Sequence, residues 1–161
     1  MATESTTPSI YVRRARPDEA GLLVDYQIHL ALETEELALD PATVSAGVQA
    51  VFDDPAKGIY WVAESENQVV GGLLTQREWS DWRNGEVWWI HSVFVAPEAR
   101  GRGVYRCLWE TLQDRVLSSQ DVVGLRLYVD RRNARAAQVY QALGMSREHY
   151  ELFEWFPEPS A

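Results

Sequence analysis

Apolar and polar positions along the chain repeat with two different periods, which predicts both strands and helices. Short apolar or alternating runs bounded by turn residues are typical of strands. Such runs occupy residues 10–14, 59–64, 68–76, 86–95, 124–129 and 150–156. Asn84-Gly85 is a strong signal for a tight hairpin turn, which joins the strand before it to residues 86–95.

Apolar residues spaced three and four positions apart predict helices between these strands. The helical patterns begin at Pro17, Pro41, Val104 and Asn133. Asp40 and Asn133 are placed to cap the helices that follow them, and Gly144 is placed to end the last helix. The order of elements predicts a mixed α/β fold with neighbouring hairpins and at least one strand–helix–strand crossover.

Composition narrows the classes of function. The 161 residues suffice for one domain with a buried core, predicted over 10–156, with a flexible tail at 1–9 and a tail at 157–161. A net charge of −9 argues against a general nucleic-acid binder, and no apolar run is long enough to span a membrane. The polar N-terminus lacks a secretory signal, so a cytoplasmic protein is expected. A single cysteine excludes an internal disulfide, and no metal site is predicted.

The segment from Val93 to Arg106 carries the clearest chemical signal in the chain. A β-branched run ends at Pro97, crosses an Arg/Gly turn and enters a helical pattern. The first turn of a helix has unpaired N–H groups and a partial positive charge, and glycines let a ligand approach the backbone. Because Arg100, Arg102 and Arg106 add full charge, a phosphate-bearing ligand is predicted here. The segment lacks the Gly-Lys-Ser/Thr of a P-loop, and an ordinary strand–helix turn would use the same glycines.

A second strand–turn–helix segment follows at residues 127–145, and together the two segments resemble the GNAT N-acetyltransferase superfamily. The first motif of that superfamily, V-x-V-x-P-x-x-(R/Q)-G-x-G-x-(G/A), is matched by Val93, Val95, Pro97, Arg100, Gly101 and Gly103. The second motif, N-x-x-A-x-x-(L/V)-Y-x-x-L-G-(F/M), is matched by Asn133, Ala136, Val139, Tyr140, Leu143, Gly144 and Met145. The order of elements over residues 10–156 also fits.

The resemblance implies a GNAT-like fold and acetyl transfer from acetyl-CoA to an amine. The implied sheet is mixed and mostly antiparallel, with six to seven strands, about four flanking helices and one splayed pair of strands. The pantetheine arm of the cofactor would pair with the backbone that the splayed strand leaves free, and N–H groups of the turn would hold the pyrophosphate. The implied cofactor-binding residues are Val93, Phe94, Val95, Arg100, Gly101, Arg102, Gly103, Val104, Tyr105, Arg106, Asn133 and Tyr140.

Two tyrosines matter to this resemblance. Tyr140 would lie beside the thioester sulfur and act as the general acid, because a phenol close to a developing thiolate can deliver a proton. A half-buried core tyrosine is the competing interpretation of the same position. Tyr105 departs from the first motif, which has a small residue there. Its amide remains, and its ring would either cover the cofactor or pack outward.

The acceptor amine must lose a proton before it can attack, so a carboxylate or an imidazole is needed nearby. The candidate bases are His91 and Glu86 on the strand before the turn, and Glu36 in the acidic run that interrupts the first helical pattern at Glu33. Strict alternation places His91 and Val93 on the same face of the sheet. A structural histidine and a solvated acidic loop are the competing interpretations.

Acidic and aromatic side chains suit an organic cation as acceptor. Substrate contacts are therefore predicted for Glu33, Glu36, Trp79, Trp82 and Trp88. Ordinary packing of the sheet against helices is the competing interpretation for the tryptophans. Alternation places Trp88 and Trp89 on opposite faces, so at most one of them need be a core residue.

The sequence therefore predicts an N-acetyltransferase that transfers the acetyl group directly to an amine, with a small molecule as the acceptor. A protein N-terminus or lysine as acceptor, a longer acyl-CoA as donor, and a non-catalytic CoA-binding regulatory module are the alternatives. Monomer and homodimer both fit the sequence.

Overall fold

The computed structural model describes residues 9–157. The chain forms two compact units, with the boundary between Leu127 and Tyr128. The predicted tails lie outside the described residues except for Ser9 and Pro157. The single domain over residues 10–156 stays a prediction. Within residues 9–157, no helix is both long enough and apolar enough to cross a membrane.

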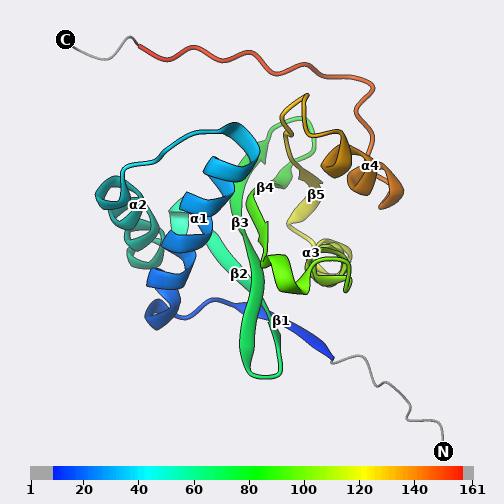
Figure 1. Ribbon diagram of the computed structural model, residues 1–161. Coiled ribbons are helices and arrows are strands. Elements are labelled where there is room, and N and C mark those ends of the chain that lie inside the picture. The colour runs from blue at the N-terminus through cyan, green and yellow to red at the C-terminus, as the bar shows by residue number, and fades with distance from the viewer. Residues whose placement is uncertain (1–8, 158–161) are drawn as a thin grey trace, which may run out of the picture. The chain divides into compact units, whose positions relative to one another are not determined.

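A five-stranded mixed sheet organises the first unit (Figure 1). Its strands follow chain order: β1 (Ile10–Arg14), β2 (Ile59–Ser65), β3 (Gln68–Ser80), β4 (Gly85–Val95) and β5 (Val122–Arg126). The first four strands pair antiparallel, and β5 pairs parallel to β4 after a crossover through α3 (Val104–Ser118). The hairpin between β3 and β4 forms as predicted, but its turn is residues 81–84: Asn84 has a φ of 47°, whereas Gly85 already belongs to β4 and pairs with Ser80.

Helices cover both faces of this sheet. On one face, Tyr26 of α1 (Ala20–Glu35) packs on Phe94, and Phe52 of α2 (Pro41–Asp53) packs on Tyr60. On the other face, Arg115 of α3 lies over the ring of Trp61. The core between these layers is apolar, and its most deeply buried large side chains are Trp61, Leu23, Leu73, Leu108, Leu112 and Val62.

The helices begin where the local signals place them. Asp40 accepts a hydrogen bond from the amide of Thr43 at 2.9 Å, and Pro41 is the first residue of α2. Pro17 opens a short 3-10 helix, η1 (Pro17–Glu19), which leads into α1. The acidic run expected to interrupt the first helix is helical up to Glu35, and the helix ends at Glu36. Glutamate is a good helix former, so the loss of apolar residues there does not end the helix.

The strand predicted over residues 150–156 is wrong, and the sheet has five strands where six to seven were expected. These residues have no regular secondary structure, and Leu152, Phe153 and Trp155 are exposed. An alternating pattern shows only that a segment could lie on a half-buried sheet, whereas a strand also needs a backbone partner. The remaining fold-class prediction, a mixed and mostly antiparallel sheet with four α-helices in the described residues, is confirmed.

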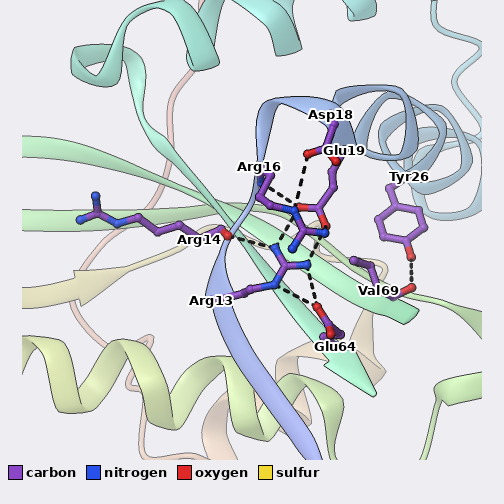
Figure 2. A network of polar contacts seen from close by, with 8 residues as sticks. All are labelled: Arg13, Arg14, Arg16, Asp18, Glu19, Tyr26, Glu64 and Val69. Atoms are coloured by element: carbon purple, nitrogen blue, oxygen red, sulfur yellow. Dashed lines mark hydrogen bonds and ion pairs between the residues drawn. The ribbon is translucent and has the colours of Figure 1, made fainter. Parts of the chain in front are cut away.

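A network of ion pairs fixes the start of α1 to the sheet, as Figure 2 shows. The guanidinium of Arg13 on β1 donates to both carboxylate oxygens of Glu19, at 2.6 and 3.0 Å, and to Glu64 on β2, at 2.7 and 2.9 Å. Glu19 also accepts from the amide of Arg16 at 2.7 Å. The Glu19 side chain is only 9% exposed. Its hydrogen bonds with Arg13 hold the pKa of its carboxyl below the ordinary value, although burial acts in the opposite direction.

Glu19→Gln is expected to destabilise the protein by about 2–3 kcal/mol at pH 7, because it removes a charged partner of the largely buried guanidinium of Arg13. The pKa of Glu19 is lower in the folded state, so its ionised form stabilises the fold above its unfolded pKa. That contribution is lost as the pH falls through the folded pKa. Urea denaturation should therefore show a difference between wild type and variant that shrinks as the pH is lowered from about 5.

Asp18→Asn is the matched control, since the Asp18 carboxylate is 76% exposed and only approaches Arg16 at 3.5 Å. It should change the free energy of unfolding by less than about 0.5 kcal/mol. A Glu19→Gln effect that does not depend on pH would contradict this account of the network.

Candidate functional site

The parallel pairing between β4 and β5 covers only the first part of β4. The pairs run from Glu86 and Val122 to Trp89 and Arg126, where β5 ends. Within the sheet of the first unit, the part of β4 from residue 90 to 95 pairs with β3 alone. Its other edge therefore presents backbone N–H and C=O groups that an extended ligand can pair with. This is the splayed strand that the sequence resemblance implies.

A bulge at Ser92 shifts the register of this part of β4. Gly72 of β3 lies opposite Phe94, and Leu74 lies opposite His91. Between these pairs β4 therefore has one residue more than β3, and Ser92 has a φ of 54°. Since Gly72 and Leu74 are two residues apart on β3, they point to the same face. Their partners His91 and Phe94 consequently share that face too.

The bulge overturns the prediction that His91 and Val93 share a face. Val93 is adjacent to Phe94 and so points to the opposite side. Phe94 packs on Tyr26 with their ring centroids 4.5 Å apart, so His91 lies on the face that α1 covers. The prediction failed because strict alternation does not hold across an inserted residue.

The turn after β4 leads directly to the N-terminus of α3. Gly101 and Gly103 have φ values of 76° and 82°, a left-handed conformation that glycine adopts at little cost. A Cβ at either position would meet nothing within 4 Å, so the conformation rather than crowding requires glycine. The amide of Cys107 donates to the Gly103 carbonyl. The amides of the turn before it have no acceptor inside the helix, and a glycine at the cap has no side chain to satisfy them.

Arg100 binds α1 and the end of β4. Its guanidinium donates to both carboxylate oxygens of Glu33, at 2.6 and 2.7 Å, and its Nε donates to the carbonyl of Val95 at 3.0 Å. The guanidinium also lies 6.0 Å from the centre of the Phe94 ring. A predicted phosphate contact, Arg100, and a predicted substrate contact, Glu33, therefore bind each other.

Three further predicted cofactor contacts, Arg102, Tyr105 and Arg106, lie in the glycine turn and in the first turn of α3. Arg102 and Arg106 are exposed, so their charges add to the partial positive charge at the N-terminus of α3. Tyr105 is half-buried, so its ring does not simply point into solvent.

A cluster of side chains from three strands lies where β5 parts from β4. Glu78 on β3 accepts hydrogen bonds from the indole N–H of Trp89 on β4 and from Arg126 on β5, the latter at 2.9 Å. The guanidinium of Arg126 lies 5.9 Å from the centre of the Trp89 ring. Trp89 in turn stacks on His91, with ring centres 6.3 Å apart and an interplanar angle of 15°. Sequence reasoning missed Glu78 and Arg126, because no local pattern links two residues 48 positions apart.

His91 is suited to accept a proton at neutral pH. Burial lowers the pKa of its imidazole below the ordinary value of 6.5, because the charged form is poorly solvated there. The neutral ring therefore predominates at pH 7. His91 belongs to the part of β4 that pairs with β3 alone, so it lies on the segment whose other edge the splay exposes.

The other two candidate bases lie elsewhere. The carboxylate of Glu86 accepts from the indole N–H of Trp88 at 3.2 Å and lies 3.5 Å from the guanidinium of Arg77. Glu86 shares a face of the strand with Trp88, and His91 shares a face with Trp89. Because Trp88 and Trp89 are neighbours, Glu86 lies on the face opposite His91. Glu36 ends α1 with a φ of 56° and is exposed. The structure thus does not bring the three candidate bases together.

The predicted substrate tryptophans also separate into two groups. Trp88 is half-buried, and its ring centre lies 6.4 Å from that of the core residue Trp61. Trp79 and Trp82, near the turn between β3 and β4, are 63% and 86% exposed. Packing therefore accounts for Trp88, whereas the hairpin tryptophans are open to a ligand.

The second unit carries the residues of the second motif on α4 (Ala134–Ala142). Asn133 accepts a hydrogen bond from the amide of Ala136 at 3.0 Å, which confirms the predicted cap. Gly144 follows the helix with a φ of 88°, which confirms its predicted place at the helix end. Burial raises the pKa of the Tyr140 phenol above its ordinary value of 10, so the hydroxyl keeps its proton at neutral pH.

The chain matches the acetyltransferase (GNAT) family over residues 26–145. No curated protein matches it. The crystal structure of a possible acetyltransferase from Clostridium difficile 630 is 35% identical, with a TM-score of 0.86, and the match covers 92% of this chain and 97% of that one.

Two more distant structures share the fold. A predicted acetyltransferase with acetyl-CoA from Clostridium acetobutylicum is 16% identical, with a TM-score of 0.72 and coverage of 91% of this chain and 96% of that one. A ribosomal-protein-alanine N-acetyltransferase from Brucella melitensis biovar Abortus 2308 is 13% identical, with a TM-score of 0.75 and coverage of 92% and 100%. At these identities the likeness concerns the fold alone.

The imidazole of His91 is expected to titrate below pH 6.5 when followed by NMR, because burial disfavours its charged form. Trp89→Leu should move the midpoint up toward 6.5, since the smaller side chain uncovers the ring stacked on it. His91→Gln identifies the resonance, and Trp82→Leu, at an exposed position, should leave the midpoint unchanged. A wild-type midpoint above 6.5 would contradict the conclusion that burial disfavours the charged form of the His91 imidazole.

Proposed function

Because the chain belongs to the GNAT acetyltransferase family, we propose that it transfers the acetyl group of acetyl-CoA to an amine. Proteins of this family use acetyl-CoA as the acetyl donor. One observation carries the proposal: the part of β4 beyond its ladder with β5, which pairs with β3 alone, leads through η3 into the glycine turn and the N-terminus of α3. An extended, amide-containing arm and a pyrophosphate are adjacent in the cofactor, just as these two features are adjacent in the chain.

The residues present suit acetyl-CoA. The amides of the turn from Gly101 to Arg106 would hold the pyrophosphate, helped by the partial charge of α3 and by Arg102. The open edge of β4, including Val93 and Val95, would pair with the pantetheine arm. The Oδ1 atom of Asn133 caps α4, so its amide N–H₂ is the group that would face this arm.

When bound, acetyl-CoA supplies an activated acetyl thioester. His91, neutral at pH 7, would accept the proton that the acceptor ammonium must lose before it can attack. The Tyr140 hydroxyl, protonated at the same pH, would donate its proton to the departing sulfur. The role of Tyr140 rests on its place in the second motif. No acyl-enzyme is required, because binding the two substrates side by side is sufficient for direct transfer.

For the acceptor, we propose a small organic amine. The net charge of −9 favours approach of a cation. Glu36 and the exposed rings of Trp79 and Trp82 offer a carboxylate and aromatic faces to such a molecule. A protein N-terminus or lysine is the second candidate acceptor, and its larger surface could also use the exposed hairpin tryptophans.

Tyr140→Phe is expected to lower kcat by about 10²-fold or more, because general acid catalysis contributes about 10²–10⁴-fold. CoA affinity should change little, since the ring remains. The measurement is release of free thiol from acetyl-CoA in the presence of a panel of small amines and lysine-containing peptides, with CoA binding followed by calorimetry. Turnover on small amines but not on peptides supports the proposed acceptor class.

Two outcomes would decide against the proposal. Tight CoA binding without turnover on any amine, and with no effect of Tyr140→Phe, would leave a non-catalytic CoA-binding module. If the protein does not bind CoA, the assignment of the glycine turn as the pyrophosphate site is wrong as well.

Gly103→Ala is expected to weaken CoA binding up to about tenfold, because the free turn of the variant relaxes away from the φ of 82° and restoring that conformation in the complex costs about 1–2 kcal/mol. Gly47→Ala on α2 is the control, since a Cβ there also meets nothing within 4 Å but the helical backbone suits alanine. Calorimetry should show unchanged CoA affinity for the control, and thermal unfolding should show a slightly more stable protein. Equal CoA affinity for Gly103→Ala and wild type would show that the phosphates are not bound at this turn.

A further inference from the structure

The ion pair between Arg100 and Glu33 joins two segments that are 67 residues apart. Both carboxylate oxygens of Glu33 accept hydrogen bonds from the guanidinium, at 2.6 and 2.7 Å. This fork-to-fork geometry holds the two side chains in one relative orientation, which a single contact would not do. Arg100 lies between η3 (Pro97–Ala99) and the two glycines of the turn, whereas Glu33 lies in the last turn of α1.

The same guanidinium is anchored on the β4 side. Its Nε donates to the last carbonyl of β4, that of Val95, and its Cζ lies 6.0 Å from the centre of the Phe94 ring. Phe94 packs on Tyr26 of α1, and the Tyr26 hydroxyl donates to the Val69 carbonyl at 2.9 Å. The start of the turn is therefore bound to α1 at two places, one apolar and buried, the other charged and partly exposed.

The charged contact lies next to the end of α1. The amides of Glu36 and Leu37 both donate to the carbonyl of Ala31, Leu37 at 3.1 Å, and so close the helix. Residues 37–40 then connect α1 to α2. Glu33, which binds Arg100, is therefore within one turn of this helix end.

We propose that Glu33 is a positioning residue that couples the glycine turn to the C-terminal end of α1, so that CoA binding at the turn stabilises residues 36–40. This inference rests on the proposed function, because it takes the turn as the CoA site. Glu33 then acts through Arg100 rather than by touching the acceptor. Arg100 serves as the link between the two segments, and the phosphates are left to backbone amides and the neighbouring arginines.

The test is amide hydrogen exchange of Glu36 and Leu37, followed by NMR with and without CoA. In wild type, saturating CoA is expected to slow exchange of these two amides by about fivefold or more, the lower end of typical coupling between sites. Glu33→Gln should abolish this protection while changing the CoA dissociation constant by less than about fivefold. Its thermal unfolding should stay close to wild type, because a partly exposed ion pair contributes little to global stability.

One variant guards against a merely structural explanation. Glu35→Gln removes the same charge from the same turn of α1 at an exposed position, and it should keep the protection.

The possible failures are distinguishable. Wild-type protein that does not bind CoA overturns the proposed function, and this inference with it. CoA binding without protection of Glu36 and Leu37, or equal protection in Glu33→Gln, overturns the coupling alone.

Discussion

The parallel ladder between β4 and β5 ends at Trp89 and Arg126, and the candidate site depends on that ending. If β5 followed β4 to its last residue, the backbone of residues 90–95 would be fully paired and closed to any extended ligand. Glu78 lies at this ending and binds both Trp89 and Arg126. The cluster thus joins the three strands just before the separation. Beyond this cluster, β4 stays paired with β3 along one edge, and its other edge has no ladder with β5.

Much of the fold follows from local sequence, because local forces decide it. A cap at Asp40, a proline at the first helical position and glycines at left-handed positions act within a few residues, and the structure has them where the sequence predicts. The glycine turn before α3 belongs to the same class. That it binds an anion stays a prediction, which rests on the partial positive charge at the N-terminus of a helix.

The features that sequence reasoning missed depend on contacts between distant segments. No periodic pattern announces that β4 carries an extra residue at Ser92, so the face of His91 was assigned incorrectly relative to Val93. Nor does any pattern pair Arg100 with Glu33. The strand expected at residues 150–156 had the right alternation but lacks a ladder partner. In each case the deciding interaction is with a segment too far away in the sequence for a periodic pattern to reveal it.

The bulge at Ser92 also lets β4 carry one residue more than β3 without changing which side chains meet the core. Removing Ser92 would restore unbroken alternation, with Val93 opposite Leu73, while Phe94 and Val95 would keep Gly72 and Gly71 as partners. The Phe94 ring would therefore stay on Tyr26. The deletion would change only the backbone between His91 and Phe94, where Ser92 has a φ of 54°. The extra residue thus alters the edge of β4 that faces away from β3 and leaves the packing of the sheet against its helices unchanged, so this point of the strand can gain or lose its bulge residue during divergence of the chain without repacking the core.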